Sequence, residues 1–241
     1  MTVSTFYPNA DPETTSMDGY AAAIADGTFA AVRADAGGFA ADASDFWVTG
    51  LEATASSGIY DQMTRAFKLF DTSTLPDSDT IDAATLEFVA ITGKKFDQFT
   101  EPLSLSLITT TPGSNTGLAA SDYPNVGTTK QATDITVASI IADSATYNAF
   151  TLNATGLGNI SKTGVSKFGF RGSFDNDNAA PTWGASLFGE VTGASAEEVL
   201  AGDKRPKLVV THTAGADPEG SLLGGKLLRG GLLQHGVLVR H

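Results

Sequence analysis

Apolar and polar residues alternate along much of the chain, a period of two that is typical of β-strands with one face against a core. In residues 103–107 leucines alternate with serines, so we expect the leucines inside and the serines facing water. In residues 166–174 Phe168, Phe170 and Phe174 alternate with small or polar residues. We expect all three phenylalanines in the core, each contributing about 1.5–3 kcal/mol.

Seven more segments combine β-branched, aromatic and alternating apolar residues, as strands do. Turn-rich stretches such as 71–79, 111–117 and 175–181 separate them. Helix is sparse, because residues 132–142 fit either a helical turn or a strand and residues 154–160 fit one short turn. This spacing predicts an all-β fold, an antiparallel β-sandwich of jelly-roll type. The seven segments are residues 28–34, 46–55, 63–70, 84–92, 149–153, 185–192 and 207–213.

The chain of 241 residues is long enough for one large β-domain with its own core. Residues 1–27 are expected to form an N-terminal extended segment. Residues 28–213 are expected to form the sandwich, since no long linker interrupts them. Residues 214–241 form a C-terminal tail rich in glycine and leucine.

The tail carries an apolar doublet every five residues, with glycines between the doublets. Five matches neither the helical nor the strand period, and each glycine disfavours a helix by about 1 kcal/mol. Neighbouring residues of an extended segment face opposite ways, so each doublet needs cover on both sides. We predict that the tail docks on another subunit or protein; the alternatives are folding back on its own sandwich or disorder. The predicted interface residues are Leu222, Leu223, Leu227, Leu228, Leu232, Leu233, Val237 and Leu238.

Charge and composition remove several classes of partner. The formal net charge is -12 and the isoelectric point about 4.5, so the basic surface that nucleic-acid binding needs is not expected. The sequence contains no run of 18 apolar residues, so it predicts no membrane-spanning helix. The chain has no cysteine, so its stability must come from burial or association and not from disulfides.

Three stretches carry a family resemblance: residues 65–76 (RAFKLFDTSTLP), 80–88 (TIDAATLEF) and 206–211 (PKLVVT). They resemble the DNRLRE-type β-sandwich domain. In that domain an Arg-x-Phe strand leads to a Phe-Asp turn and a Leu-Pro, an Ala-x-Leu strand follows, and a Pro-Lys-Leu-x-Val strand closes the fold. The resemblance implies a place among carbohydrate-associated modules or bacteriophage virion proteins.

The opening residues 5–19 also resemble the start of tailed-phage structural proteins that carry no secretory leader. The resemblance implies a non-enzymatic virion protein made in the host cytoplasm: a head decoration or fibre protein, or a tail accessory protein. Its partners would be other virion proteins and copies of itself, and a trimer is one form that such a homo-oligomer could take. The alternative is a carbohydrate-binding module or a receptor-binding fibre domain that recognises a host-surface glycan.

Catalytic chemistry has little support in the sequence. The histidines are His212, His235 and His241, and we expect no catalytic constellation around them. The 27 acidic residues allow too many carboxylate pairs to indicate a glycosidase. We therefore expect that the protein is not an enzyme and that it requires neither a cofactor nor a metal.

Three further hypotheses concern individual side chains. The oxygen-rich residues 175–178 fit either a calcium loop or a plain turn. Arg65 shares a strand face with two apolar residues, so its guanidinium is expected at a sheet margin against backbone carbonyls or an acid. Five aromatics could form a sugar-stacking platform or pack in the core, with Trp47 alternating inward and Trp183 capping an edge. They are Trp47, Trp183, Tyr20, Tyr60 and Tyr123.

Overall fold

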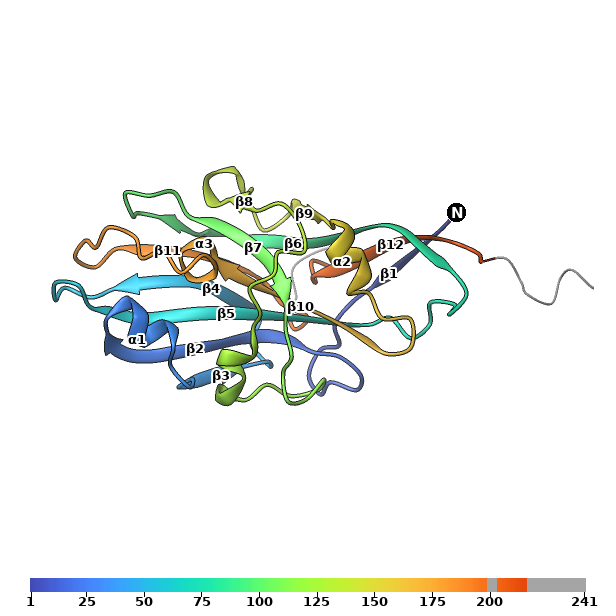
Figure 1. Cartoon of the computed structure of the whole chain (residues 1–241), viewed down its shortest axis with the longest axis horizontal. Helices are drawn as coiled ribbons and strands as arrows, with labels where there is room; N and C mark the ends of the chain where they lie inside the picture. Colours follow the sequence, from blue (N-terminus) through green and yellow to red (C-terminus); the bar gives the residue numbers. More distant parts are fainter. Residues whose placement is uncertain (199–202, 216–241) are drawn as a thin grey trace, which may run out of the picture.

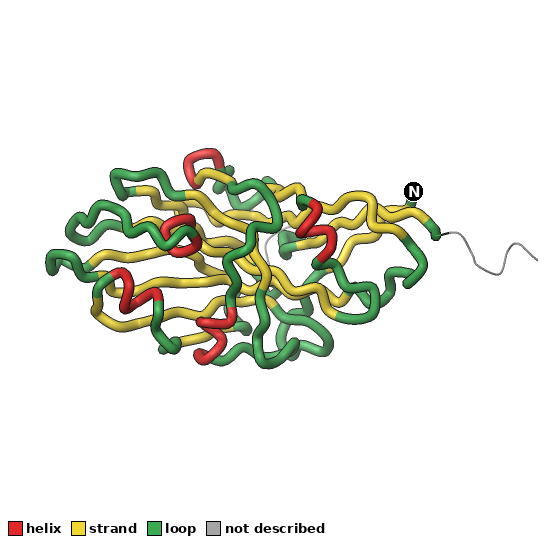
Figure 2. The backbone as a smooth tube through the Cα atoms, viewed as in Figure 1, coloured by secondary structure: helices red, strands yellow, loops and turns green. Residues whose placement is uncertain are grey.

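The computed structural model describes residues 1–198 and 203–215. The protein is all-β, with antiparallel strands in a curled sheet of sandwich, jelly-roll-like form, as the sequence predicts. The long strands run along the longest axis of the molecule (Figure 1), and the few helices are short (Figure 2). None of the helices in the described residues is long and apolar enough to cross a membrane.

Twelve strands and five short helical segments make up the described part of the chain. The strands are β1 (Thr2–Phe6), β2 (Asp18–Gly27), β3 (Phe39–Ala41), β4 (Phe46–Ala53), β5 (Tyr60–Asp71), β6 (Thr80–Asp97), β7 (Ser104–Thr109), β8 (Ile135–Thr136), β9 (Tyr147–Thr151), β10 (Val165–Gly172), β11 (Phe188–Ala194) and β12 (Lys207–Thr213). The helical segments are α1 (Phe29–Arg33), α2 (Ala154–Gly158) and α3 (Ser173–Asn176), with 3-10 turns η1 (Ala120–Asn125) and η2 (Val137–Ser139).

Strands β5 and β6 organise the sheet, whose main path runs β1-β12-β6-β11-β4-β5-β10-β7-β8. Along β5, one edge pairs with β2, while the other pairs first with β4 and then with β10. Strand β6 pairs with β9 and β12 through its first half and with β11 through its second. Because both long strands change partners along their length, the sheet curls around a core.

Aromatic side chains from four strands fill the centre of that core. The Trp47 ring lies 4.9 Å from the Phe170 ring and 5.5 Å from the Phe88 ring. Phe150 completes the group, with its ring 5.6 Å from that of Phe170. Gly193 lies opposite Trp47 on the neighbouring strand, and a Cβ there would overlap the indole ring. The prediction that Trp47 turns inward is confirmed.

Most predicted strands are confirmed, but residues 28–34 are not a strand. They form helix α1, in which the Thr28 side chain accepts a hydrogen bond from the backbone N–H of Ala31. Phe29 and Val32, three residues apart, are buried on one face of this helix. The capping threonine and this spacing favour a helix more strongly than the β-propensity of the segment favours a strand. Residues 1–27, expected to lie ahead of the sandwich, form β1 and β2 within the sheet.

Two details of the predicted alternation are also wrong. Phe174 is buried as expected, but it lies in α3 and not on a strand, because β10 ends at Gly172. Ser106 is fully buried, although we expected the serines of this strand to face water. Strand β7 pairs with β10 on one edge and β8 on the other, and both of its faces are covered. Residues 132–142 supply both β8 and η2, and residues 154–160 supply α2.

Candidate functional site

The predicted docking residues of the tail lie outside the residues that the structure describes, so that interface stays a prediction. They are Leu222, Leu223, Leu227, Leu228, Leu232, Leu233, Val237 and Leu238. Candidate sites within the described residues are a buried arginine network, an outer hollow and a histidine group.

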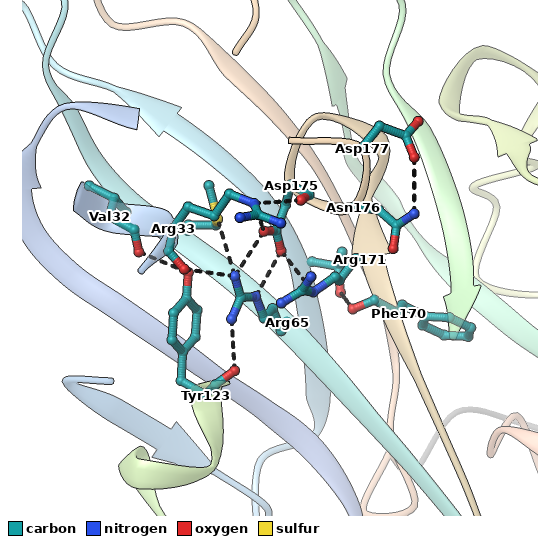
Figure 3. Close-up of polar contacts among 11 residues, drawn as sticks. Val32, Arg33, Arg65, Tyr123, Phe170, Arg171, Asp175, Asn176 and Asp177 are labelled. Atoms are coloured by element: carbon teal, nitrogen blue, oxygen red, sulfur yellow. Dashed lines mark hydrogen bonds and ion pairs between the residues drawn. The ribbon is translucent and has the colours of Figure 1, made fainter. Parts of the chain in front are cut away.

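The buried arginine network is centred on Arg65 of β5 (Figure 3). Its Nε and Nη2 donate to the two carboxylate oxygens of Asp175 at 2.7 and 2.8 Å. It also donates to the backbone carbonyl oxygens of Tyr123 and Arg33, at 2.9 and 3.0 Å, and Nη2 lies 4.0 Å from Met63 Sδ. The guanidinium thus contacts an acid and backbone carbonyls, as predicted, but in the interior and not at a sheet margin, since Arg65 is 2% exposed.

Two more arginines share the same carboxylate. Arg171 Nε lies 3.2 Å from Asp175 Oδ2, and Arg33 Nε lies 3.4 Å from Asp175 Oδ1. Burial lowers the pKa of Arg171 to about 10; the charge of Asp175 acts against this shift, and the charges of Arg65 and Arg33 add to it. Three guanidinium groups around one acid hold α1, α3, β5 and β10 together. Such a network fixes the packing of segments that are distant in sequence.

The hypothesis that residues 175–178 form a calcium loop is wrong in this structure. Both oxygens of Asp175 face guanidinium groups, and Asn176 is buried and donates to Asp177 Oδ1 at 3.0 Å. A cation would have to displace three like charges. Within residues 1–198 and 203–215, no group of three acidic or histidine side chains forms a metal site.

Of the two alternatives for the five aromatics, the structure favours packing in the core over a sugar-stacking platform. Trp47, Tyr20, Tyr60 and Tyr123 are buried, and the Tyr123 hydroxyl donates to the Val32 carbonyl at 3.0 Å. Trp183 is half-buried and donates through Nε1 to a backbone carbonyl. These rings contribute mainly to the buried apolar area of the fold, as large aromatic side chains usually do.

An outer hollow of about 220 Å³ opens on the side of the sheet opposite Trp47. Its residues come from three neighbouring strands, β4, β11 and β6. Phe46, which is 38% exposed, stacks on the Tyr20 ring at 5.9 Å. Phe39, 41% exposed, lies 5.7 Å from the same ring but does not line the hollow. The lining residues are Phe46, Val48, Ile91, Lys94, Glu190 and Thr192.

The polar groups of the outer hollow are a carboxyl, an ammonium and a hydroxyl. Burial raises the pKa of the Glu190 carboxyl, and Lys94 partly offsets this. Glu52 follows along the same sheet face, and burial and then the charge of Glu190 raise its pKa. An aromatic wall beside hydrogen-bonding groups suits a ring that carries hydroxyl groups.

The histidine group joins three segments at the edge of the sheet. His212 Nε2 lies 3.0 Å from Ser4 Oγ, and its Nδ1 lies 2.6 Å from Asp79 Oδ2. We expected no partners of this kind around His212, and the order of groups matches that of a serine-hydrolase triad. None of the six residues that line the outer hollow belongs to this group. Its bonds tie the strand β1 to β12 and to Asp79, the residue before β6.

Sequence reasoning missed Ser4 and Asp79, because 208 and 133 residues separate them from His212. It also missed the outer hollow, although the alternation of Phe46, Trp47 and Val48 placed the first and third on the face away from the core. Comparison with protein-family models gives no match, and comparison with curated proteins finds no similar sequence.

Proposed function

We propose that this chain is a non-enzymatic structural protein of a tailed-bacteriophage virion, exposed on the particle as a head decoration, fibre or tail accessory protein. In this proposal the sandwich faces water, and the tail, residues 214–241, anchors it to other virion proteins or to copies of itself. The resemblance of residues 65–76, 80–88 and 206–211 to DNRLRE-type domains supports it.

The observation that carries the proposal is the continuous core of the body. Buried residues of β2, β4, β5, β6, β7, β9, β10, β11 and β12 form one hydrophobic cluster with one another. Among the described residues this cluster gives the sandwich a core of its own, and we propose that the apolar doublets of the tail serve contacts with other proteins. A cluster of large aliphatic side chains is an adhesive surface, which is what an anchoring segment needs.

Deleting residues 220–241 tests the anchor. We expect a soluble, folded body that no longer joins particles, measured by light scattering and by incorporation into assembled virions. The matched variant keeps the length and changes Leu227, Leu228, Leu232 and Leu233 to serine, which removes the apolar groups alone. Assembly that is unchanged in both variants would contradict the proposal.

The outer hollow supports a second candidate function, binding of a host-surface glycan. A glycan array compares the wild type with Phe46→Ala and Glu190→Gln, which remove the aromatic wall and the carboxylate. Phe39→Ala is the control, since Phe39 is an exposed aromatic that does not line the hollow. Specific binding that Phe46→Ala and Glu190→Gln abolish would favour the receptor-binding function; no specific binding favours pure decoration.

The histidine group tests the non-enzymatic part of the proposal. A hydrolase needs oxyanion donors and a substrate cleft besides its serine, histidine and acid. We expect a fluorophosphonate probe to leave Ser4 unmodified, measured by peptide mass spectrometry. Labelling of Ser4 that His212→Asn abolishes would overturn this assignment.

A further inference from the structure

A fully buried ion pair joins two neighbouring strands, β2 and β5, which lie side by side (Figure 1). Asp18 and Lys68 are direct cross-strand partners in the register. Lys68 Nζ lies 2.6 Å from Asp18 Oδ2, and both side chains are 0% exposed. Taking two such charges out of water is costly, so the site calls for a further explanation.

The surroundings of the pair hold groups that assist acyl chemistry. The backbone N–H of Ala196 donates to Asp18 Oδ1 at 2.9 Å, where negative charge would develop in an attack on the carboxyl carbon. The Trp47 ring lies 4.7 Å from Lys68 Nζ and covers it from the core side. Water is excluded, because the pair has no exposed surface.

Glu197 supplies a second carboxyl beside this pair. Its Oε1 accepts a hydrogen bond from the backbone N–H of Asp11 at 3.1 Å, while its buried Oε2 has no hydrogen-bond partner among the described residues. Burial, and then the charge of Asp18, raise the pKa of Glu197 to about 7. Burial lowers the pKa of Lys68 to about 8. Both groups can therefore exchange a proton near neutral pH.

We propose that Lys68 and Asp18 of the folded chain become joined by an amide bond between Nζ and Cγ, with Glu197 as the proton relay. Glu197 takes a proton from the Lys68 ammonium, and the freed lone pair attacks Cγ. The Cγ–Oδ2 bond then breaks, and the oxygen leaves as water. Of the three ammonium protons, one stays on the amide nitrogen and two leave with the oxygen, so the step needs no further reactant.

Two physical effects drive this reaction in the fold. The strand register holds nucleophile and acid together, which replaces a bimolecular encounter by an intramolecular one. The product amide is neutral, so it removes two charges from a site without water. The bond would fix β2 to β5 permanently.

Intact-mass spectrometry of the purified full chain tests the proposal directly. We expect a mass lower than that of the sequence by one water molecule. Trypsin should then leave Lys68 uncut, so that the peptide ending at Arg33, which contains Asp18, is joined to residues 66–94. A wild-type chain with the full mass and two separate peptides would overturn the proposal.

Substitutions distinguish the role of Lys68, which forms the bond, from that of Glu197, which transfers the proton. Lys68→Met should restore the full mass, and Glu197→Gln should leave most of the chain unlinked while Asp18 and Lys68 remain. Glu198→Gln is the matched control, because it changes the adjacent carboxyl, and it should lose water as the wild type does. A Glu197→Gln chain that links as fast as the wild type would overturn the role of Glu197.

Discussion

The two faces of β5 carry two buried cations, and the charge of each is neutralised in a different way. Arg65 and Lys68 are three residues apart on this strand, so their side chains leave it on opposite faces. Both are buried and both pair with one aspartate, Asp175 and Asp18 respectively. Around Arg65 cations outnumber the acid, whereas around Lys68 carboxyls outnumber the cation.

This difference follows from the chemistry of the two side chains. The planar guanidinium of Arg65 donates to Asp175 and also to two backbone carbonyls, so several hydrogen bonds fix its position. Lys68 has one acid partner and an aromatic ring beside it, and burial brings its pKa down to about 8. The arginine face is therefore a permanent clamp, and the lysine face is a site where a proton can move.

The largest effect is expected from Asp175→Asn. It leaves three guanidinium groups in the interior without their common anion, which should lower the free energy of unfolding by about 3–5 kcal/mol. Urea unfolding measures this loss. The control Asp177→Asn changes an exposed acid of the same segment and should cost no more than about 0.5 kcal/mol. Equal losses would show that the clamp carries no stability.

On the lysine face, we expect Lys68→Met to lower the stability of the fold, and we expect Asp18→Asn to restore part of that loss. The single variant leaves Asp18 buried near Glu197 without a cation, and Asp18→Asn removes that charge while keeping an acceptor for Ala196. The double variant should therefore be about 1–3 kcal/mol more stable than the single one. Neither chain can form the amide, so urea unfolding compares electrostatics alone. A double variant that is less stable would contradict the acid excess on this face.

The sequence predicted the strands because a period of two is a local property, and β4, β10 and β12 all show it. It predicted the partners of Arg65 by type and not by identity. The choice of Asp175 among 27 acids depends on packing over 110 residues. One local signal was overlooked: Lys68 stands between apolar neighbours on both sides, Phe67 and Leu69, in a strand buried on both faces. A cation there must find a buried partner.

A smaller effect is expected at the rim of the arginine network. Arg33 donates through Nε to the backbone carbonyl of Asp175 at 2.8 Å, and its side chain is 26% exposed. Arg33→Gln should cost about 1 kcal/mol, the value of one hydrogen bond, because water can replace the lost contact. Arg205→Gln is the control at an exposed pair and should change the unfolding midpoint less. A loss as large as that of Asp175→Asn would place Arg33 inside the clamp.

The smallest effect is a change in pH dependence on the lysine face. The pKa of Glu197 is raised from 4.5 to about 7 in the folded chain, so between these values the folded state holds a proton that the unfolded state has released. This carboxyl therefore adds stability below about pH 4.5, and the contribution is lost as the pH rises through about 7.

The comparison is made in the Lys68→Met background, where no amide forms. Changing Glu197 to Gln should reduce the fall in unfolding midpoint between about pH 5 and pH 7, measured in urea. Asp26→Asn, at an exposed acid, is the control and should leave that slope unchanged. The arginine face should show no such slope, because the pKa of Arg171, at about 10, lies above this window. Equal slopes with and without Glu197 would mean that the two faces of β5 differ in composition alone and not in their ability to move a proton.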